Sequence, residues 1–166
     1  MLSLSKKTDY GLLALSHLTK LKEGEAASAR ELAIEFAIPT ELLAKIMQRL
    51  ARADIVRSIS GPSGGYRLSR PAKEISIASV ISAIEGTPAF TQCTKSDGTD
   101  CDQLTRCTIR KPLAHIHAKI LQMLSLITLA EFDESDSTTY PVVLMSQAAK
   151  PRTTTVMPLY GHKNED

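Results

Sequence analysis

The stretch that decides the fold runs from Ser28 to Arg70 and reads SARELAIEFAIPTELLAKIMQRLARADIVRSISGPSGGYRLSR. It opens with Ser28-x-x-Glu31, the form of a capping box, in which two side chains satisfy free backbone N–H groups at the start of a helix. We expect that helix to run to about Phe36. Pro39 cannot continue it but can begin the next helix, so a tight turn is predicted between the two.

The segment from Thr40 to Arg52 has the strongest helical pattern in the chain. Its apolar residues recur at i, i+3, i+4 and i+7, which gives one stripe for the core: Leu43, Ile46, Met47 and Leu50. The opposite face is polar, and it carries Glu41, Lys45 and Gln48. Two helices joined by a short turn, the second polar and basic on its outer side, indicate a helix-turn-helix.

A basic hairpin is predicted directly after this helix. Residues 55–60 are rich in β-branched side chains, residues 61–65 form a glycine-rich turn, and residues 66–69 return as a second strand. Between Thr40 and Lys73, seven basic minus two acidic residues give +5, while the whole chain is only +2. A hairpin in this place is a wing, and the local basic patch indicates a polyanionic partner.

The candidate DNA contacts follow from this arrangement. A helix-turn-helix lays its second helix in the major groove, where Gln pairs with adenine and Lys with guanine or phosphate. The wing arginines are expected to meet phosphate or the minor groove, and its glycines allow close approach to the DNA backbone. The alternative, a merely solvated helix face, is weakened by the basic wing. The candidates are Ser28, Thr40, Glu41, Ala44, Lys45, Gln48, Arg49, Arg57, Gly61 and Arg67.

Three cysteines, Cys93, Cys101 and Cys107, lie in a polar segment without periodicity, which predicts a loop. Their spacing is neither that of a zinc ribbon nor that of a four-cysteine ferredoxin run. A loop with three thiols can donate three ligands to an iron–sulfur cluster, which then needs a fourth. The candidates for that ligand are Asp9 of either subunit, His115 and His117. Incidental thiols, a zinc site and a metal-free thiol switch stay open as alternatives.

A long helix is predicted after Pro112. Its apolar residues recur at spacings of 3, 4, 4 and 3 on one side, with further leucines on a second side. Such a helix needs a partner beyond its own domain, and two-fold dimers dominate oligomers, so we expect a homodimer through helix 113–131. The expected organisation is a winged helix-turn-helix domain (1–88), a cysteine loop (89–112), a dimerisation helix (113–132) and a flexible tail (133–166).

Several classes are excluded at this point. The start of the chain lacks the apolar region of a signal peptide, and no run reaches the ~20 apolar residues of a membrane span. The protein is therefore expected in the cytoplasm, without a membrane. An enzyme is not expected, because the only Cys–His combination, Cys107 with His115 or His117, lacks any sign of a substrate site. The fold class is mainly α with a small β-wing.

Strings along the chain closely resemble those of the winged-helix iron–sulfur regulators that include IscR, NsrR and the Suf-operon regulators. The resemblance covers about residues 2–132 and is most specific where a wing string and a cysteine loop occur together. The matching strings are Ser28-x-x-Glu31-Leu32-Ala33, Ile38-Pro39, Leu43-x-x-Ile46-x-x-x-Leu50, Gly61-Pro62-Ser63-Gly64-Gly65-Tyr66-Arg67-Leu68, Val80-Ile81-x-x-Ile84-Glu85-Gly86 and Ile127-Thr128-Leu129-Ala130. Residues 107–112 look most like the Suf-operon regulators.

The resemblance implies that Cys93, Cys101 and Cys107 are thiolate ligands. The IscR-like pattern has a histidine three residues after the third cysteine, where this chain has Arg110. NsrR-like proteins use an aspartate in the first helix, which Asp9 matches, so Asp9 is the preferred fourth ligand. An oxygen ligand binds iron more weakly than thiolate, which suits a sensor.

The resemblance further implies a transcription regulator whose operator affinity is controlled by the cluster, with double-stranded operator DNA as partner and cluster-assembly genes as targets. A 2Fe–2S cluster is preferred over a 4Fe–4S cluster. The alternatives are a metal-free thiol-redox repressor and a nitric-oxide-sensing repressor. The chain departs from the IscR-like pattern just before the wing turn, where it has Ser60 and the IscR-like pattern has an arginine. Reading of the minor groove at that point is therefore not carried over.

Overall fold

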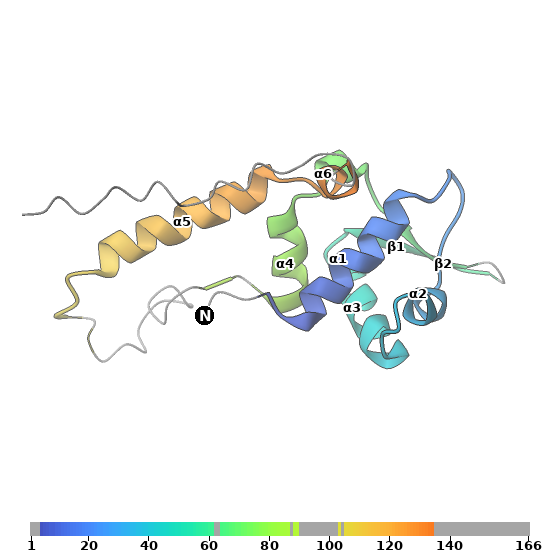
Figure 1. Ribbon diagram of the computed structural model, residues 1–166, viewed down its shortest axis with the longest axis horizontal. Helices are drawn as coiled ribbons and strands as arrows, with labels where there is room; N and C mark the ends of the chain where they lie inside the picture. The colour runs from blue at the N-terminus through green and yellow to red at the C-terminus, as the bar shows by residue number, and fades with distance from the viewer. Residues whose placement is uncertain (1–3, 62–63, 87, 90–102, 104, 135–166) are drawn as a thin grey trace, which may run out of the picture.

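The computed structural model describes residues 4–61, 64–86, 88–89, 103 and 105–134. A mainly helical head carries a small β-hairpin, and one long helix extends away from it (Figure 1). The elements are α1 (Lys6–Thr19), α2 (Ala29–Glu35), α3 (Thr40–Arg52), β1 (Val56–Ile59), β2 (Gly65–Leu68), η1 (Ala72–Glu74), α4 (Ile77–Glu85), α5 (Arg110–Leu126) and α6 (Leu129–Glu134). This confirms the expected class, mainly α with a β-wing.

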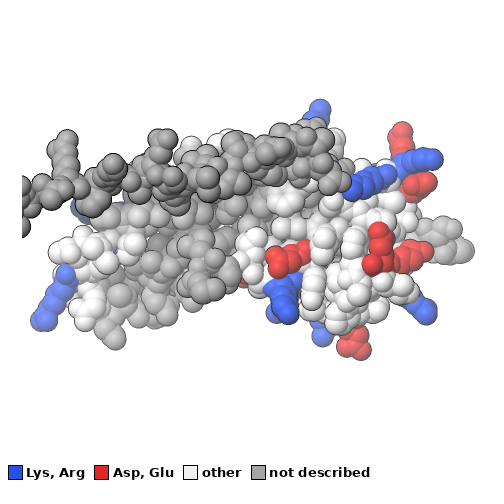
Figure 2. All heavy atoms as spheres, in the orientation of Figure 1, with Lys and Arg blue, Asp and Glu red and all other residues white. Residues whose placement is uncertain are grey.

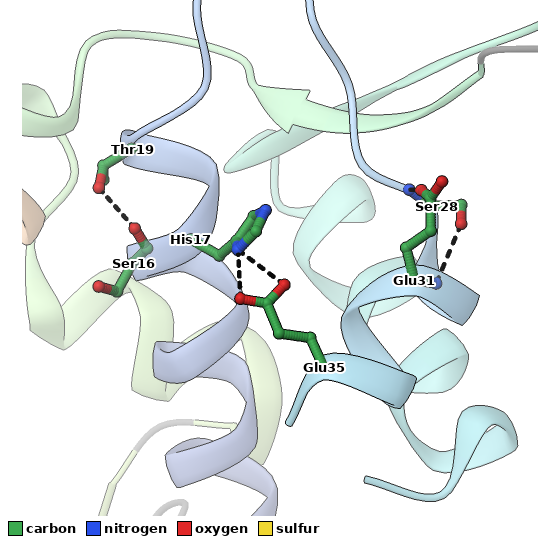
Figure 3. Close-up of polar contacts among 6 residues, drawn as sticks. All are labelled: Ser16, His17, Thr19, Ser28, Glu31 and Glu35. Carbon is green, nitrogen blue, oxygen red and sulfur yellow. Dashed lines mark hydrogen bonds and ion pairs between the residues drawn. The ribbon is translucent and has the colours of Figure 1, made fainter. Parts of the chain in front are cut away.

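The helix-turn-helix forms as its local signals predict. The Ser28 hydroxyl accepts a bond of 3.1 Å from the Glu31 N–H, and the Glu31 carboxylate accepts one of 2.7 Å from the Ser28 N–H (Figure 3). These two bonds complete the capping box and begin α2. In the turn after α2, Ala37 has a φ of 52°, a left-handed conformation that costs a non-glycine residue about 1–2 kcal/mol.

The core of the head is aliphatic. The predicted stripe of α3 is buried: Leu43, Ile46, Met47 and Leu50 are each at most 2% exposed. Buried side chains of α1, α2 and α4 belong to the same cluster. A further contact joins α1 to α2 at the surface, where His17 Nδ1 lies 3.0 Å from the Glu35 carboxylate (Figure 3). The stripe therefore fixes α3 with its polar face outward.

The wing is an antiparallel pair in which Arg57 lies opposite Arg67. The stretch before α2 joins it, because Ala27 and Tyr66 exchange two backbone hydrogen bonds of 3.1 and 2.8 Å. A Cβ at Gly65 would lie 2.5 Å from the carbonyl carbon of Ala27. Only glycine fits such an approach, so Gly65 holds the wing against the start of the helix-turn-helix.

The expected single helix over 113–131 is wrong in its extent. α5 begins three residues earlier, at Arg110, and ends at Leu126. Ile127 is extended, and a new helix begins after Thr128, whose N–H and hydroxyl both donate to Glu131 at 3.0 Å. Leu129 is fully buried in the head rather than displayed on the long helix.

The first helix ends at Thr19, and Lys20 follows as its C-cap. α6 reaches Glu134, so it takes in the first two residues of the predicted tail, and residues 135–166 lie outside the described part of the chain. No helix among the described residues is long and apolar enough to cross a bilayer.

Candidate nucleic-acid interface and metal ligands

The outer face of α3 presents polar side chains to solvent. Thr40, Glu41, Lys45 and Gln48 are exposed, and Ala44 between them is half-buried. Because the apolar stripe of α3 is buried in the head, these side chains share the free side of the helix. Their residue types supply both donors and an acceptor, which is what reading base edges requires.

The wing carries two arginines, one on each strand. Arg57 on β1 is exposed and Arg67 on β2 is half-buried, and the two are direct cross-strand partners. Like charges directly opposite are unfavourable in a hairpin, so a bound anion would stabilise the pair. Among the described residues the buried Nε of Arg67 has no hydrogen-bond partner. A phosphate bound to the two arginines would reduce their mutual repulsion.

Three other residues that are predicted to contact DNA have structural roles in the head. Ser28 is the N-cap of α2, and its hydroxyl accepts a bond from the backbone. Gly61 opens the wing turn with a φ of +126°, in a region that favours glycine. Arg49 directs a guanidinium N–H to the carbonyl oxygen of Ile84 on α4. For all three residues, contact with DNA stays a prediction.

The candidate metal ligands are described only in part. Cys107 is a half-buried free thiol just before α5, and Asp9 is exposed in the first turn of α1. Cys93 and Cys101 lie outside the described residues. In one chain the start of α5 is the end farthest from the head that contains α1 (Figure 1). The structure therefore does not bring Asp9 and Cys107 of the same chain together.

The two histidines weighed as the fourth ligand both lie on α5. His115 is exposed, whereas His117 is half-buried and has an interaction partner. No group of three or more metal-binding side chains occurs within the described ranges. These observations give neither histidine an advantage over Asp9.

Charge is distributed unevenly over the molecule. Figure 2 shows acidic and basic side chains interspersed over one face of the head, whereas the described residues at the free end of α5 show basic ones. The sequence of α5 contains Arg110, Lys111 and Lys119 and no acidic residue. Cations beside Cys107 suit a site that holds anionic sulfur ligands.

One polar cluster was not predicted from the sequence. Glu85, the last residue of α4, accepts hydrogen bonds from the Ser5 N–H (3.2 Å), the Ser5 hydroxyl (2.7 Å) and the hydroxyl of Thr8. The Ser5 side chain and then Thr8 hold the pKa of Glu85 below its ordinary value by stabilising the carboxylate. The partners are about eighty residues apart in the chain, so no local pattern signals this cluster.

Comparisons with known proteins agree with the geometry. A model of the Rrf2 family, described as an iron-dependent transcriptional regulator, matches residues 4–134. CymR, the global cysteine regulator of B. subtilis, is 24% identical with a TM-score of 0.64, over 81% of this chain and 98% of its own. The IscR of T. potens is 22% identical with a TM-score of 0.63, over 90% and 93% of the two chains.

A third structure, the oxidized form of Staphylococcus aureus CymR, is 25% identical with a TM-score of 0.61, over 80% of this chain and 97% of its own. Members of the matched family are regulators of transcription that bind DNA, not enzymes. Because the family model covers most of the sequence, and the head and wing match its solved structures, the chain belongs to the Rrf2 family of winged-helix transcriptional regulators.

Proposed function

We propose that this protein is a homodimeric, cytoplasmic regulator whose affinity for operator DNA is controlled by an iron–sulfur cluster. The observation that carries the proposal is the iron-dependent family match over residues 4–134, a span that includes all three cysteines and Asp9. The DNA-binding face, the dimer helix and the metal ligands each add an independent argument. Cluster-assembly genes are the proposed targets.

For DNA, α3 is the element that enters the major groove. Gln48 and Lys45 are the proposed base contacts, and both are exposed on its free face. Arg57 and Arg67 on the wing clamp a phosphate, which relieves the repulsion between two facing cations. Phosphate contacts fix the position of the protein on the duplex, and contacts to base edges give the sequence preference.

For the dimer, α5 is the proposed interface. No side chain of α5 is buried within one chain, although the helix carries many large apolar residues. Ile109 before the helix and Ile116 and Met123 within it are spaced by seven residues, and each is more than half exposed. A stripe at this spacing packs against a second helix of the same kind.

For the metal, the donor set is three thiolates and one carboxylate: Cys93, Cys101, Cys107 and Asp9. These donors are chemically suited to iron, and cations of residues 106–111 surround Cys107 in the sequence. Because α1 and the free end of α5 lie apart within one chain, Asp9 of the partner subunit is the proposed fourth ligand. The cluster supplies a reactive, oxidisable centre; a 2Fe–2S form is proposed before a 4Fe–4S form.

Two other sensing modes are the alternatives. A metal-free thiol switch is favoured by the likeness to S. aureus CymR, of which an oxidized form has been solved. A nitric-oxide-sensing repressor is favoured by the position of Asp9, which matches the NsrR-like pattern. The first predicts regulation without iron, and the second predicts loss of DNA affinity after exposure of the loaded protein to nitric oxide.

The experiment compares iron-loaded and iron-free protein for binding to the duplex that the wild type enriches from a random-sequence pool. The proposal predicts a difference in affinity that disappears in the triple variant C93S/C101S/C107S. Asp9→Ala should shorten the lifetime of the visible absorption of the cluster, whereas the matched control Glu23→Ala, another exposed carboxylate, should not. Equal affinities of loaded and iron-free protein contradict cluster control.

The DNA surface has its own test. Arg57→Ala should weaken binding to all duplexes and lower the slope of affinity against salt by about 1, because one phosphate contact is lost. Gln48→Ala should instead relax preference at one base pair, by about 1–3 kcal/mol. The control is Lys22→Ala, an exposed cation outside both α3 and the wing.

A further inference from the structure

The last turn of α4 contacts α1 and α3 at the same point. The side chain of Ile84 is 1% exposed, and its Cδ1 lies 2.4 Å from the position that a Cβ on Gly11 of α1 would occupy. The same position is 3.3 Å from Ile46 Cγ2 of α3. Because Gly11 has no side chain, Ile84 packs against the backbone of α1 directly beside α3, the proposed recognition helix.

Side chains of α1 and α3 also make polar contacts with this turn. The carbonyl oxygen of Ile84 accepts a hydrogen bond from Arg49 of α3. The carboxylate of the next residue, Glu85, accepts hydrogen bonds from Ser5 and Thr8 at the start of α1. The carbonyl of Ile84 and the N–H of Glu85 belong to one planar peptide unit. A rotation of this peptide unit, which displaces the Cα of Glu85, therefore moves the acceptor of Arg49 as well.

The last turn of α4 lies next to both segments that carry the proposed metal ligands. Asp9, the proposed metal ligand, follows Thr8 directly in the first turn of α1. On the other side, α4 ends at Gly86 with a φ of 86°, and the sequence continues toward Cys93. The turn thus connects both proposed ligand segments with the helix that reads DNA, through contiguous hydrogen bonds and packing.

We propose that Glu85 and Arg49 are positioning residues that transmit changes at the ligand segments to the recognition helix. Arg49 acts through the Ile84 carbonyl rather than through DNA, which assigns a different role to a residue expected in the DNA contact set. Glu85 holds the first turn of α1, with Asp9, in a fixed relation to that carbonyl. The inference rests on the proposed function, because the cluster is what would change the ligand segments. The contacts between α1, α4 and α3 do not require iron and can be tested in the iron-free protein.

The test is hydrogen–deuterium exchange on the full-length, iron-free protein, with wild type, Glu85→Ala, Arg49→Met and the double variant. Glu85→Ala should raise the exchange rate about five-fold or more in the first turn of α1 and in α3, because three hydrogen bonds to its carboxylate are lost. In the Arg49→Met background, Glu85→Ala should still act on α1 but add nothing in α3. Arg49→Gln is the second variant if Arg49→Met does not fold.

The matched control is Glu131→Ala. Glu131 resembles Glu85, because its carboxylate also accepts from a backbone N–H and a threonine hydroxyl, but both donors belong to Thr128 at the start of α6. Its loss should raise exchange in α6 alone. An effect of Glu85→Ala confined to α1, or an equal effect on α3 with and without Arg49, overturns the coupling.

A second measurement separates this inference from the proposed function. The ratio of duplex affinities between iron-loaded and iron-free protein should fall toward one in Arg49→Met. A wild-type ratio of one refutes cluster control, and the exchange experiment still decides the coupling. A wild-type ratio that Arg49→Met leaves unchanged refutes the role of Arg49 in transmission.

Discussion

The exposed apolar stripe on α5 gives a quantitative prediction for the dimer. Ile116 and Met123 lie seven residues apart, and they are 52% and 54% exposed in a single chain. Replacing both with serine should leave the head folded, because neither side chain belongs to its core. The same change should weaken the association of two chains, because the stripe is the surface that they bury.

The magnitude follows from the exposed fractions. Burying a whole Ile or Met side chain is worth about 1.5–3 kcal/mol, so the exposed half of each contributes about 1 kcal/mol. A two-fold interface counts every residue twice, so the two substitutions together remove about 4 kcal/mol. That loss raises the dissociation constant of the dimer about 1,000-fold.

The assay is sedimentation velocity over a range of protein concentrations, with thermal unfolding as a check on the fold. The matched control is Leu13→Ser, because Leu13 is 44% exposed but lies on α1. The control should dimerise like the wild type. A double α5 variant that dimerises as tightly as the control would refute the assignment of α5 as the interface.

Three further predictions concern stability and are read from urea or thermal unfolding. Gly65→Ala should destabilise the head and weaken duplex binding, because its Cβ would lie 2.5 Å from the Ala27 carbonyl carbon; wild-type stability would show that the wing is not pressed against that segment. Leu129→Ala should cost about 2–5 kcal/mol because the side chain is fully buried, whereas Ile34→Ala, 71% exposed, should cost under about 0.5; equal costs would contradict the placement of α6. The N-cap of α2 holds the pKa of Glu31 below 4.5, so the folded protein binds fewer protons than the unfolded chain in that range. Stability should fall as the pH drops below about 4.5 toward the lower pKa that Glu31 has in the folded protein, and Glu31→Gln should flatten this fall. An unchanged pH profile would contradict a stabilising role of the capping bond.

The parts of the fold that local physics decides were predictable from the sequence. The bounds of α3 agree to the residue, because its apolar stripe and the proline before it act within a few residues. The capping box of α2 formed as expected for the same reason. These elements position the α3 part of the predicted DNA-binding face.

The end of α5 was not predicted, because tertiary contacts outweigh its helical periodicity. Ile77 donates to the Ile127 carbonyl at 2.9 Å, and Leu129 donates to the Ile75 carbonyl at 2.8 Å. These bonds hold residue 127 in an extended conformation. The signal for the new helix was nevertheless present, since Thr128-x-x-Glu131 has the form of a capping box, and Glu131 accepts from the Thr128 N–H as that motif requires.

The candidate site shows the same division. The exposed residues of α3 and the facing arginines of the wing follow from helical and strand periodicity. The bond from Arg49 to Ile84 and the cluster around Glu85 join residues far apart in the chain, so periodicity could not reveal them. Sequence reasoning listed Arg49 only as a DNA contact, and the structure adds a bond from its guanidinium to α4.

The most direct test of the central claim is the iron and acid-labile sulfide content of full-length protein purified without oxygen. The account predicts that both are present, with visible absorption, and that C93S/C101S/C107S contains neither. A colourless wild-type protein, free of iron and sulfide even after reconstitution, would contradict it and leave only the DNA-binding half.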